Sequence, residues 1–222
     1  STAQLARGSL AANGTIDTRQ KALNLETQLN QVSGLLASTP ELAASGKVGI
    51  TGTFSAPQIN ADVNLKGVEA FNRTVAQLVS DTPRLRANVV KAGETYQLQH
   101  IAIEGGVLVL NGTGTYGPKG KITLNAGFTQ TDTTILSGTE INLSEGKVQI
   151  IGQGGVDTIS LTSQGGILSR NGVDLTDLET SLRLDNTPAG WTGPITLKGM
   201  KGGNAIDITS QLSWADGVFS LQ

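Results

Sequence analysis

Apolar residues recur along this chain as pairs separated by one polar or small residue. Side chains on a β-strand alternate between the faces of the sheet, so each pair puts two aliphatic groups on one face and a polar group on the other. The pattern therefore predicts strands with one apolar and one polar face. The residues expected on the apolar face are Val48, Ile50, Val63, Leu65, Ile101, Ile103, Ile122, Leu124, Phe128, Ile141, Leu143, Val148, Ile150, Ile159, Leu161, Leu182, Leu184, Ile195, Leu197, Ile206 and Ile208.

Turn signals between these pairs place the strands next to one another along the chain. Residues 5–16 and 22–32 flank a polar turn at 17–20 and predict a hairpin. From residue 84 onward, clusters of Gly, Pro and Asn recur at short intervals between alternating runs, which is typical of an antiparallel meander. A second, minor helix or turn is predicted near 175–180.

One segment has helical rather than strand periodicity. Five apolar residues recur at helical spacing over 68–82, and Pro83 ends the run. These residues are Val68, Phe71, Val75, Leu78 and Val79. We therefore expect one short helix near 68–82 in a chain that is otherwise all-β.

The composition favours a single curled sheet over two packed sheets. Aromatic residues make up only 4% of the chain, whereas a sandwich usually fills its interior with bulky side chains from both layers. The 29 glycines suit bulges and strong curvature. The expected fold is one long curled antiparallel sheet, a U-shaped β-groove with an apolar interior.

A loose internal repeat bears on domain organisation. Residues 46–65 and 107–124 both contain an apolar strand, Gly-Thr, an aromatic residue, Pro and an alternating strand. We expect residues 1–222 to form one β-groove segment with loose sub-units 1–67, 84–152 and 153–222. Because both ends interrupt the pattern, we expect a segment of a longer protein. No apolar run is long enough to span a bilayer.

Several function classes find no support in the composition. The chain has no cysteine, one histidine and a net charge of −2, which argues against thiolate metal sites and a nucleic-acid interface. The G-x-G-x-x-G match at 112–117 leads into another strand rather than the helix that a dinucleotide site needs, so we interpret it as a turn. His100 falls on the polar phase of its strand. We expect no enzyme activity, no metal and no cofactor.

The apolar face itself is the candidate site. A contiguous apolar patch of this size marks a binding or an aggregation surface. Burying each CH₂ group is worth about 0.8 kcal/mol, so an acyl chain of about sixteen carbons gains on the order of 10 kcal/mol. Headgroups can stay in water outside such a groove, which predicts phospholipid acyl chains as the ligand.

The motif G-x-V-x-I-x-G-T…P-x-I-x-A-x-V-x-L at Gly46–Leu65 resembles the AsmA-like superfamily, and within it the TamB (translocation and assembly module) type. The run 101–128 is similar. The resemblance implies a periplasmic β-groove on a protein anchored in the inner membrane through regions absent here. It implies phospholipid transport to the outer membrane, outer-membrane biogenesis, an outer-membrane barrel assembly protein as a partner, and no catalytic residues.

Two other interpretations remain open at this stage. A structural β-solenoid or sandwich from a secreted adhesin or surface protein fits the Gly, Thr and Asn content. A scaffold that binds strands during outer-membrane protein assembly is the other, because exposed sheet edges can pair with a partner strand.

Overall fold

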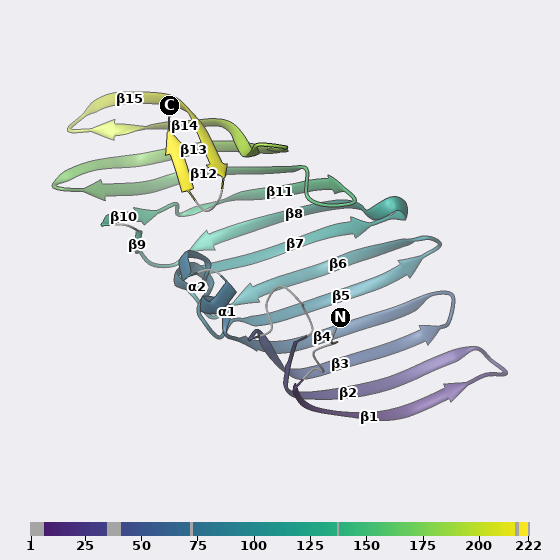
Figure 1. The fold of residues 1–222 in the computed structure, drawn as a ribbon. Coiled ribbons are helices and arrows are strands. Elements are labelled where there is room, and N and C mark those ends of the chain that lie inside the picture. The colour runs from purple at the N-terminus through teal and green to yellow at the C-terminus, as the bar shows by residue number, and fades with distance from the viewer. Residues whose placement is uncertain (1–6, 35–40, 72, 137, 216–217, 222) are drawn as a thin grey trace. The chain divides into compact units, whose positions relative to one another are not determined.

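The computed structural model describes residues 7–34, 41–71, 73–136, 138–215 and 218–221. These residues are mostly β-strand, with a short helical region and one 3₁₀ turn (Figure 1). The chain divides into two compact units, residues 1–113 and 114–222, and the boundary falls within strand β7. The predicted all-β fold, with curled antiparallel pairing and one short helical region, is confirmed. The three loose sub-units expected from the repeat stay a prediction.

Unit 1 is an antiparallel sheet whose strands are hydrogen-bonded in chain order. The predicted hairpin is confirmed: Ile16 pairs with Leu23, and Asp17 Oδ1 accepts the N–H groups of Arg19 and Gln20 at 2.8 and 2.9 Å in the turn. The strands are β1 (Arg7–Asp17), β2 (Ala22–Ser33), β3 (Ala43–Thr53), β4 (Pro57–Lys66), β5 (Arg84–Ala92), β6 (Thr95–Glu104) and β7 (Leu108–Tyr116).

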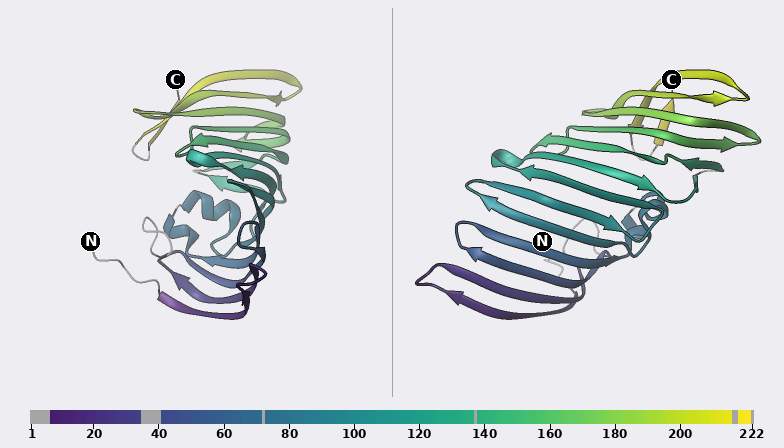
Figure 2. Two further views of the ribbon diagram at one scale, coloured as in Figure 1. Left: turned by 90° about the vertical axis from the view of Figure 1, so that its right-hand side faces the viewer. Right: turned by 180° about the vertical axis from the view of Figure 1, so that it is seen from behind.

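The predicted helix is present but shorter and divided. It consists of α1 (Val68–Phe71) and α2 (Arg73–Val79), on the concave side of the unit 1 strands (Figure 2). Helical structure ends at Val79 because Ser80 adopts a left-handed φ of 75°, three residues before Pro83. The side chains of Phe71 and Val75 lie outside the described ones.

A glycine allows this helical region to approach the sheet. A Cβ at Gly106 would lie 2.4 Å from the carbonyl oxygen of Leu78 and from the carbonyl carbon of Val79. Val68, at the start of α1, is only 6% exposed. The helices thus cover part of the unit 1 sheet.

Unit 2 is also an antiparallel sheet, in the order β8-β11-β12-β13-β14-β15-β16, with β10 pairing β9 and β12. A 3₁₀ turn, η1 (Pro118–Gly120), precedes it. The strands are β8 (Lys121–Gln130), β9 (Thr134–Leu136), β10 (Thr139–Asn142), β11 (Glu145–Gln153), β12 (Thr158–Arg170), β13 (Val173–Thr187), β14 (Gly190–Lys201), β15 (Asn204–Ala215) and β16 (Val218–Leu221).

Two local predictions are wrong. Residues 112–116 of the glycine motif belong to β7, and the turn follows them at η1. Residues 175–180 lie within β13 and are neither helix nor turn. There Leu175 and Leu178 are buried on the sheet, so packing decides the conformation of a segment whose spacing also suits a helix.

Buried Gln130 holds the segment between β8 and β11 that carries β9 and β10, which we call the excursion. Its side-chain Nε2 donates to the carbonyl oxygens of Asp132 and Ile141 at 2.9 and 2.8 Å, and its Oε1 accepts the Leu143 N–H at 2.9 Å. A polar residue at this buried position is therefore fully used in hydrogen bonds to the backbone.

Candidate apolar binding face

In unit 1 the strand register places the predicted apolar residues in rows with other, mostly apolar residues. Of the predicted residues here, Val63 is 6% exposed and Val48, Ile50, Leu65, Ile101 and Ile103 are half-buried. We call the following set the unit 1 face. Its rows across β2 to β6 are Leu25–Ile50–Ile59–Val89–Leu98, Thr27–Val48–Ala61–Ala87–Ile101 and Leu29–Gly46–Val63–Leu85–Ile103, with Val32–Ala44–Leu65 across β2 to β4.

Unit 2 has an equivalent set of rows, which we call the unit 2 face. Phe128 and Leu184 are 4% and 8% exposed, Ile208 is 45% exposed, and the other predicted residues of these rows are half-buried. The rows are Leu124–Ile150–Ile159–Leu184, Ala126–Val148–Leu161–Leu182–Ile195 and Phe128–Gly146–Ser163–Thr180–Leu197–Ile208.

The remaining predicted residues extend the unit 2 face or lie beside it. Ile122 pairs with Gly152, and Ile206 pairs with Gly199. Ile141 on β10 pairs with Leu168 of β12 and so continues the face over the excursion. Leu143 follows β10 and is half-buried.

Among the described strands, β-bulges in β2, β6 and β13 keep the apolar residues on one face. In β6, Asn88 pairs with His100 and Val89 with Leu98, so Gln99 is the extra residue and the apolar phase changes from Leu98 to Ile101. The same change occurs from Leu29 to Val32 in β2 and from Leu175 to Leu178 in β13, where Gln31 and Asp177 have left-handed φ values of 51° and 50°.

These bulges were not predicted from the sequence, although each leaves a signal in it. In all three strands the apolar spacing is three residues where regular alternation gives two: Leu29-x-x-Val32, Leu98-x-x-Ile101 and Leu175-x-x-Leu178. In a strand that keeps one face buried, a spacing of three requires an extra residue at that point. The three-residue spacing therefore indicates a bulge wherever the segment is known to be a strand.

Charged side chains pair with one another on the opposite face. Arg84 donates to both carboxylate oxygens of Asp62, at 2.7 Å (Nε–Oδ1) and 2.5 Å (Nη2–Oδ2), and holds the pKa of that carboxyl below its ordinary value. In unit 2, Arg183 and the Thr158 hydroxyl lower the pKa of Asp185 in the same way. Further cross-strand pairs are Lys47–Glu26, Arg86–Glu104 and Lys198–Asp207.

The described residues contain no group of three or more His, Asp or Glu side chains that could hold a metal ion. His100, predicted to face solvent, is exposed beside Asn88. Within the same described part of the chain, no helix is both long and apolar enough to cross a bilayer.

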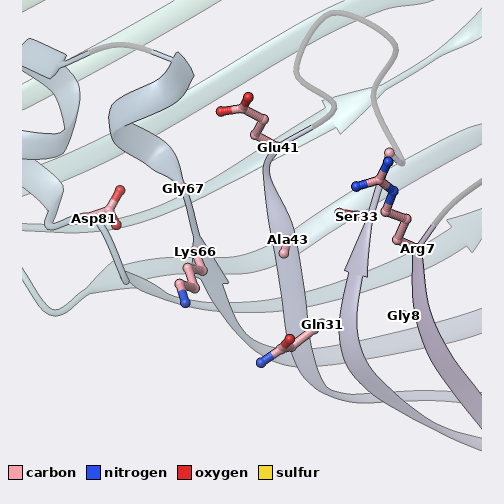
Figure 3. A pocket seen from close by; sticks show the side chains of 10 residues that line it. Arg7, Gly8, Gln31, Ser33, Glu41, Ala43, Lys66, Gly67 and Asp81 are labelled. Atoms are coloured by element: carbon pink, nitrogen blue, oxygen red, sulfur yellow. The ribbon is translucent and has the colours of Figure 1, made fainter. Parts of the chain in front are cut away.

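A hollow of about 720 Å³ lies at the strand ends of unit 1, beside the Val32 row (Figure 3). Arg7, Glu41, Lys66 and Asp81 bring charges of both signs to its walls. The labelled side chains do not converge on one point: Lys66 points away from Glu41. The hollow is a polar rim to the unit 1 face rather than a site for one ion.

Comparison of the chain with protein-family models, with curated proteins and with solved structures gives no match.

Proposed function

We propose that this chain is a non-enzymatic segment of a periplasmic groove that conducts phospholipid between the inner and outer membranes and so supports outer-membrane biogenesis. The observation that carries this proposal is the pair of apolar faces. In each unit, aliphatic side chains stand opposite one another over several strands, and most remain half-exposed. Covering such a surface with hydrocarbon removes apolar area from water and is therefore favourable.

The segregation of charge supports lipid rather than a polar ligand. The ion pairs lie on the face opposite to the apolar rows, as the register of Asp62, Arg86 and Arg183 requires. An acyl chain on the apolar rows meets no charged group there, whereas a zwitterionic headgroup can lie at a polar rim such as the hollow of unit 1. This division matches an amphipathic ligand.

Site-specific photocrosslinking in cells tests the proposal. A photoreactive residue at Ile101 or Ile150 is expected to capture phospholipid, and one at the adjacent, exposed His100 or Gln149 is not. His100 is the better control in β6, because Ala102, the other neighbour of Ile101, is only 1% exposed. Equal capture at all four positions, or none at any, contradicts the proposal.

A further inference from the structure

Two hydroxyl groups are buried within the mostly apolar unit 2 face. Ser163 on β12 and Thr180 on β13 are direct partners in the register, and they are 3% and 8% exposed. Neither Ser163 Oγ nor Thr180 Oγ1 has a hydrogen-bond partner among the residues that the structure describes. Buried hydroxyls are normally paired, so two unpaired ones side by side require an explanation.

Their neighbours within the row and in one adjacent row are apolar. Phe128 and Gly146 precede the two residues in their row, and Leu197 follows. The row of Leu161 and Leu182 lies beside them. On these sides the two O–H donors border hydrocarbon.

A ligand for this site must combine hydrocarbon with a neutral acceptor. The nearest cations in the register, Lys147 and Arg183, pair with Thr162 and Ser160 and so belong to the opposite face. A carboxylate or phosphate would lie there without a counter-charge, which is costly in an apolar environment. An ester carbonyl has no charge, and its oxygen has two lone pairs.

We propose that Ser163 and Thr180 together bind the ester carbonyl of a diacyl lipid whose acyl chain lies on the unit 2 face. Directly opposed residues have Cβ atoms about 5 Å apart, so both hydroxyls can donate to one carbonyl oxygen. The proposal requires a half-buried neighbour to move aside; Leu197 pairs with Thr180, and a rotamer change at a surface takes nanoseconds or less. This inference rests on the proposed lipid-binding function and adds the position of the ester group.

The test compares two lipids on the purified chain: dioleoyl phosphatidylethanolamine and the dialkyl ether analogue with the same headgroup, which lacks the carbonyls. Binding is measured by transfer of each lipid from vesicles. The variant Ser163→Ala with Thr180→Val removes both hydroxyls. Its matched control is Thr162→Val with Ser181→Ala, because these two residues are also direct partners but lie on the opposite face of the same strands.

The unmodified chain is expected to bind the diacyl lipid about tenfold more tightly than the ether lipid, as two modest hydrogen bonds allow. The ratio is expected to decrease to about one in the Ser163/Thr180 variant and to persist in the control. Equal binding of both lipids by the unmodified chain overturns this inference alone. Tighter binding of free oleate than of the diacyl lipid overturns the assignment to an ester, and binding of no lipid overturns the proposed function itself.

Discussion

Phe128 lies across Gly146, its direct partner in the β8–β11 register. A Cβ at Gly146 would be 2.5 Å from Cζ of the Phe128 ring and 2.1 Å from the carbonyl oxygen of Thr162. The glycine thus provides the space that lets the ring lie down on the sheet. This contact explains why Phe128, at 4% exposure, is among the most buried residues of the unit 2 face.

Substitution Gly146→Ala is expected to destabilise the chain by about 2 kcal/mol or more, because the new methyl group meets backbone atoms that cannot rotate away. Urea unfolding followed by far-ultraviolet circular dichroism measures the loss. Gly155→Ala is the matched control, since a Cβ there has no atom within 4 Å. An equal effect at both positions would show that the loss reflects replacement of glycine as such and not the lack of space beside Thr162 and Phe128.

The Asp62–Arg84 pair predicts a pH-dependent contribution to stability. The pKa of Asp62 is lower in the folded chain than its ordinary value of 3.8, because Arg84 donates two hydrogen bonds to the carboxylate. The ionised pair therefore stabilises the fold fully above about pH 3.8, and this contribution is lost as the pH decreases through the folded-state pKa. The pair is solvent-exposed, so the effect is small.

Asp62→Asn is accordingly expected to lower the unfolding free energy at pH 7 and to have little effect near pH 2. Unfolding curves at both pH values test this. Arg84→Gln removes the other partner and is expected to give the same pH profile. A loss that is as large at pH 2 as at pH 7 would assign the effect to packing.

Gln130 is expected to be the most sensitive glutamine of unit 2. Gln130→Leu leaves the Ile141 carbonyl and the Leu143 N–H without their side-chain partners, each at a cost of about 1–3 kcal/mol. Gln149→Leu, which removes an exposed bond to Asn125, is expected to cost less than about 0.5 kcal/mol. Thermal unfolding separates the two; similar shifts for both would mean that the excursion is not held by Gln130.

The β6 bulge predicts which single-residue deletion the chain tolerates. Deletion of Gln99 leaves Leu98 and His100 on the faces that they already occupy, because Gln99 has no partner on β5. Deletion of Ala102 moves part of the strand to the wrong face and is expected to cost several times more. Soluble yield and the urea midpoint compare the two variants, and better tolerance of the Ala102 deletion would contradict the register.

In the absence of lipid, Ser163→Ala with Thr180→Val is expected to raise the unfolding free energy by about 1 kcal/mol, because it removes two unpaired buried hydroxyls. Differential scanning calorimetry of the lipid-free chain measures this. A lower melting temperature would mean that the hydroxyls have partners within the protein. Higher stability together with weaker ester preference would link the unpaired groups to binding.

Much of the fold was predictable from alternation alone. A pair such as Ile195 and Leu197 places two aliphatic side chains on one face whatever lies beside the strand, because the period of two is a property of the backbone. The turn residue Asp17 likewise acts through its own neighbours. Prediction of the β1–β2 hairpin, and of which residues share the apolar side of each strand, therefore needed no tertiary information.

Local patterns are less decisive where two structures share a spacing. Leu175 and Leu178 are three residues apart, which suits one turn of a helix as well as a bulged strand, and only pairing with β12 and β14 decides for the strand. The segment after Val68 also has helical spacing, but here the helix forms. It is helical as predicted, but it ends early because Ser80 turns the chain back to meet β5.

The sequence by itself determined that this chain forms strands with one aliphatic and one polar face, since each strand carries that information within a few residues. Only the tertiary structure decided which residues stand opposite one another, because register depends on hydrogen bonds between segments far apart in the chain. The approach of Phe128 to Gly146, the ion pair of Asp62 with Arg84 and the opposed hydroxyls of Ser163 and Thr180 all depend on that register.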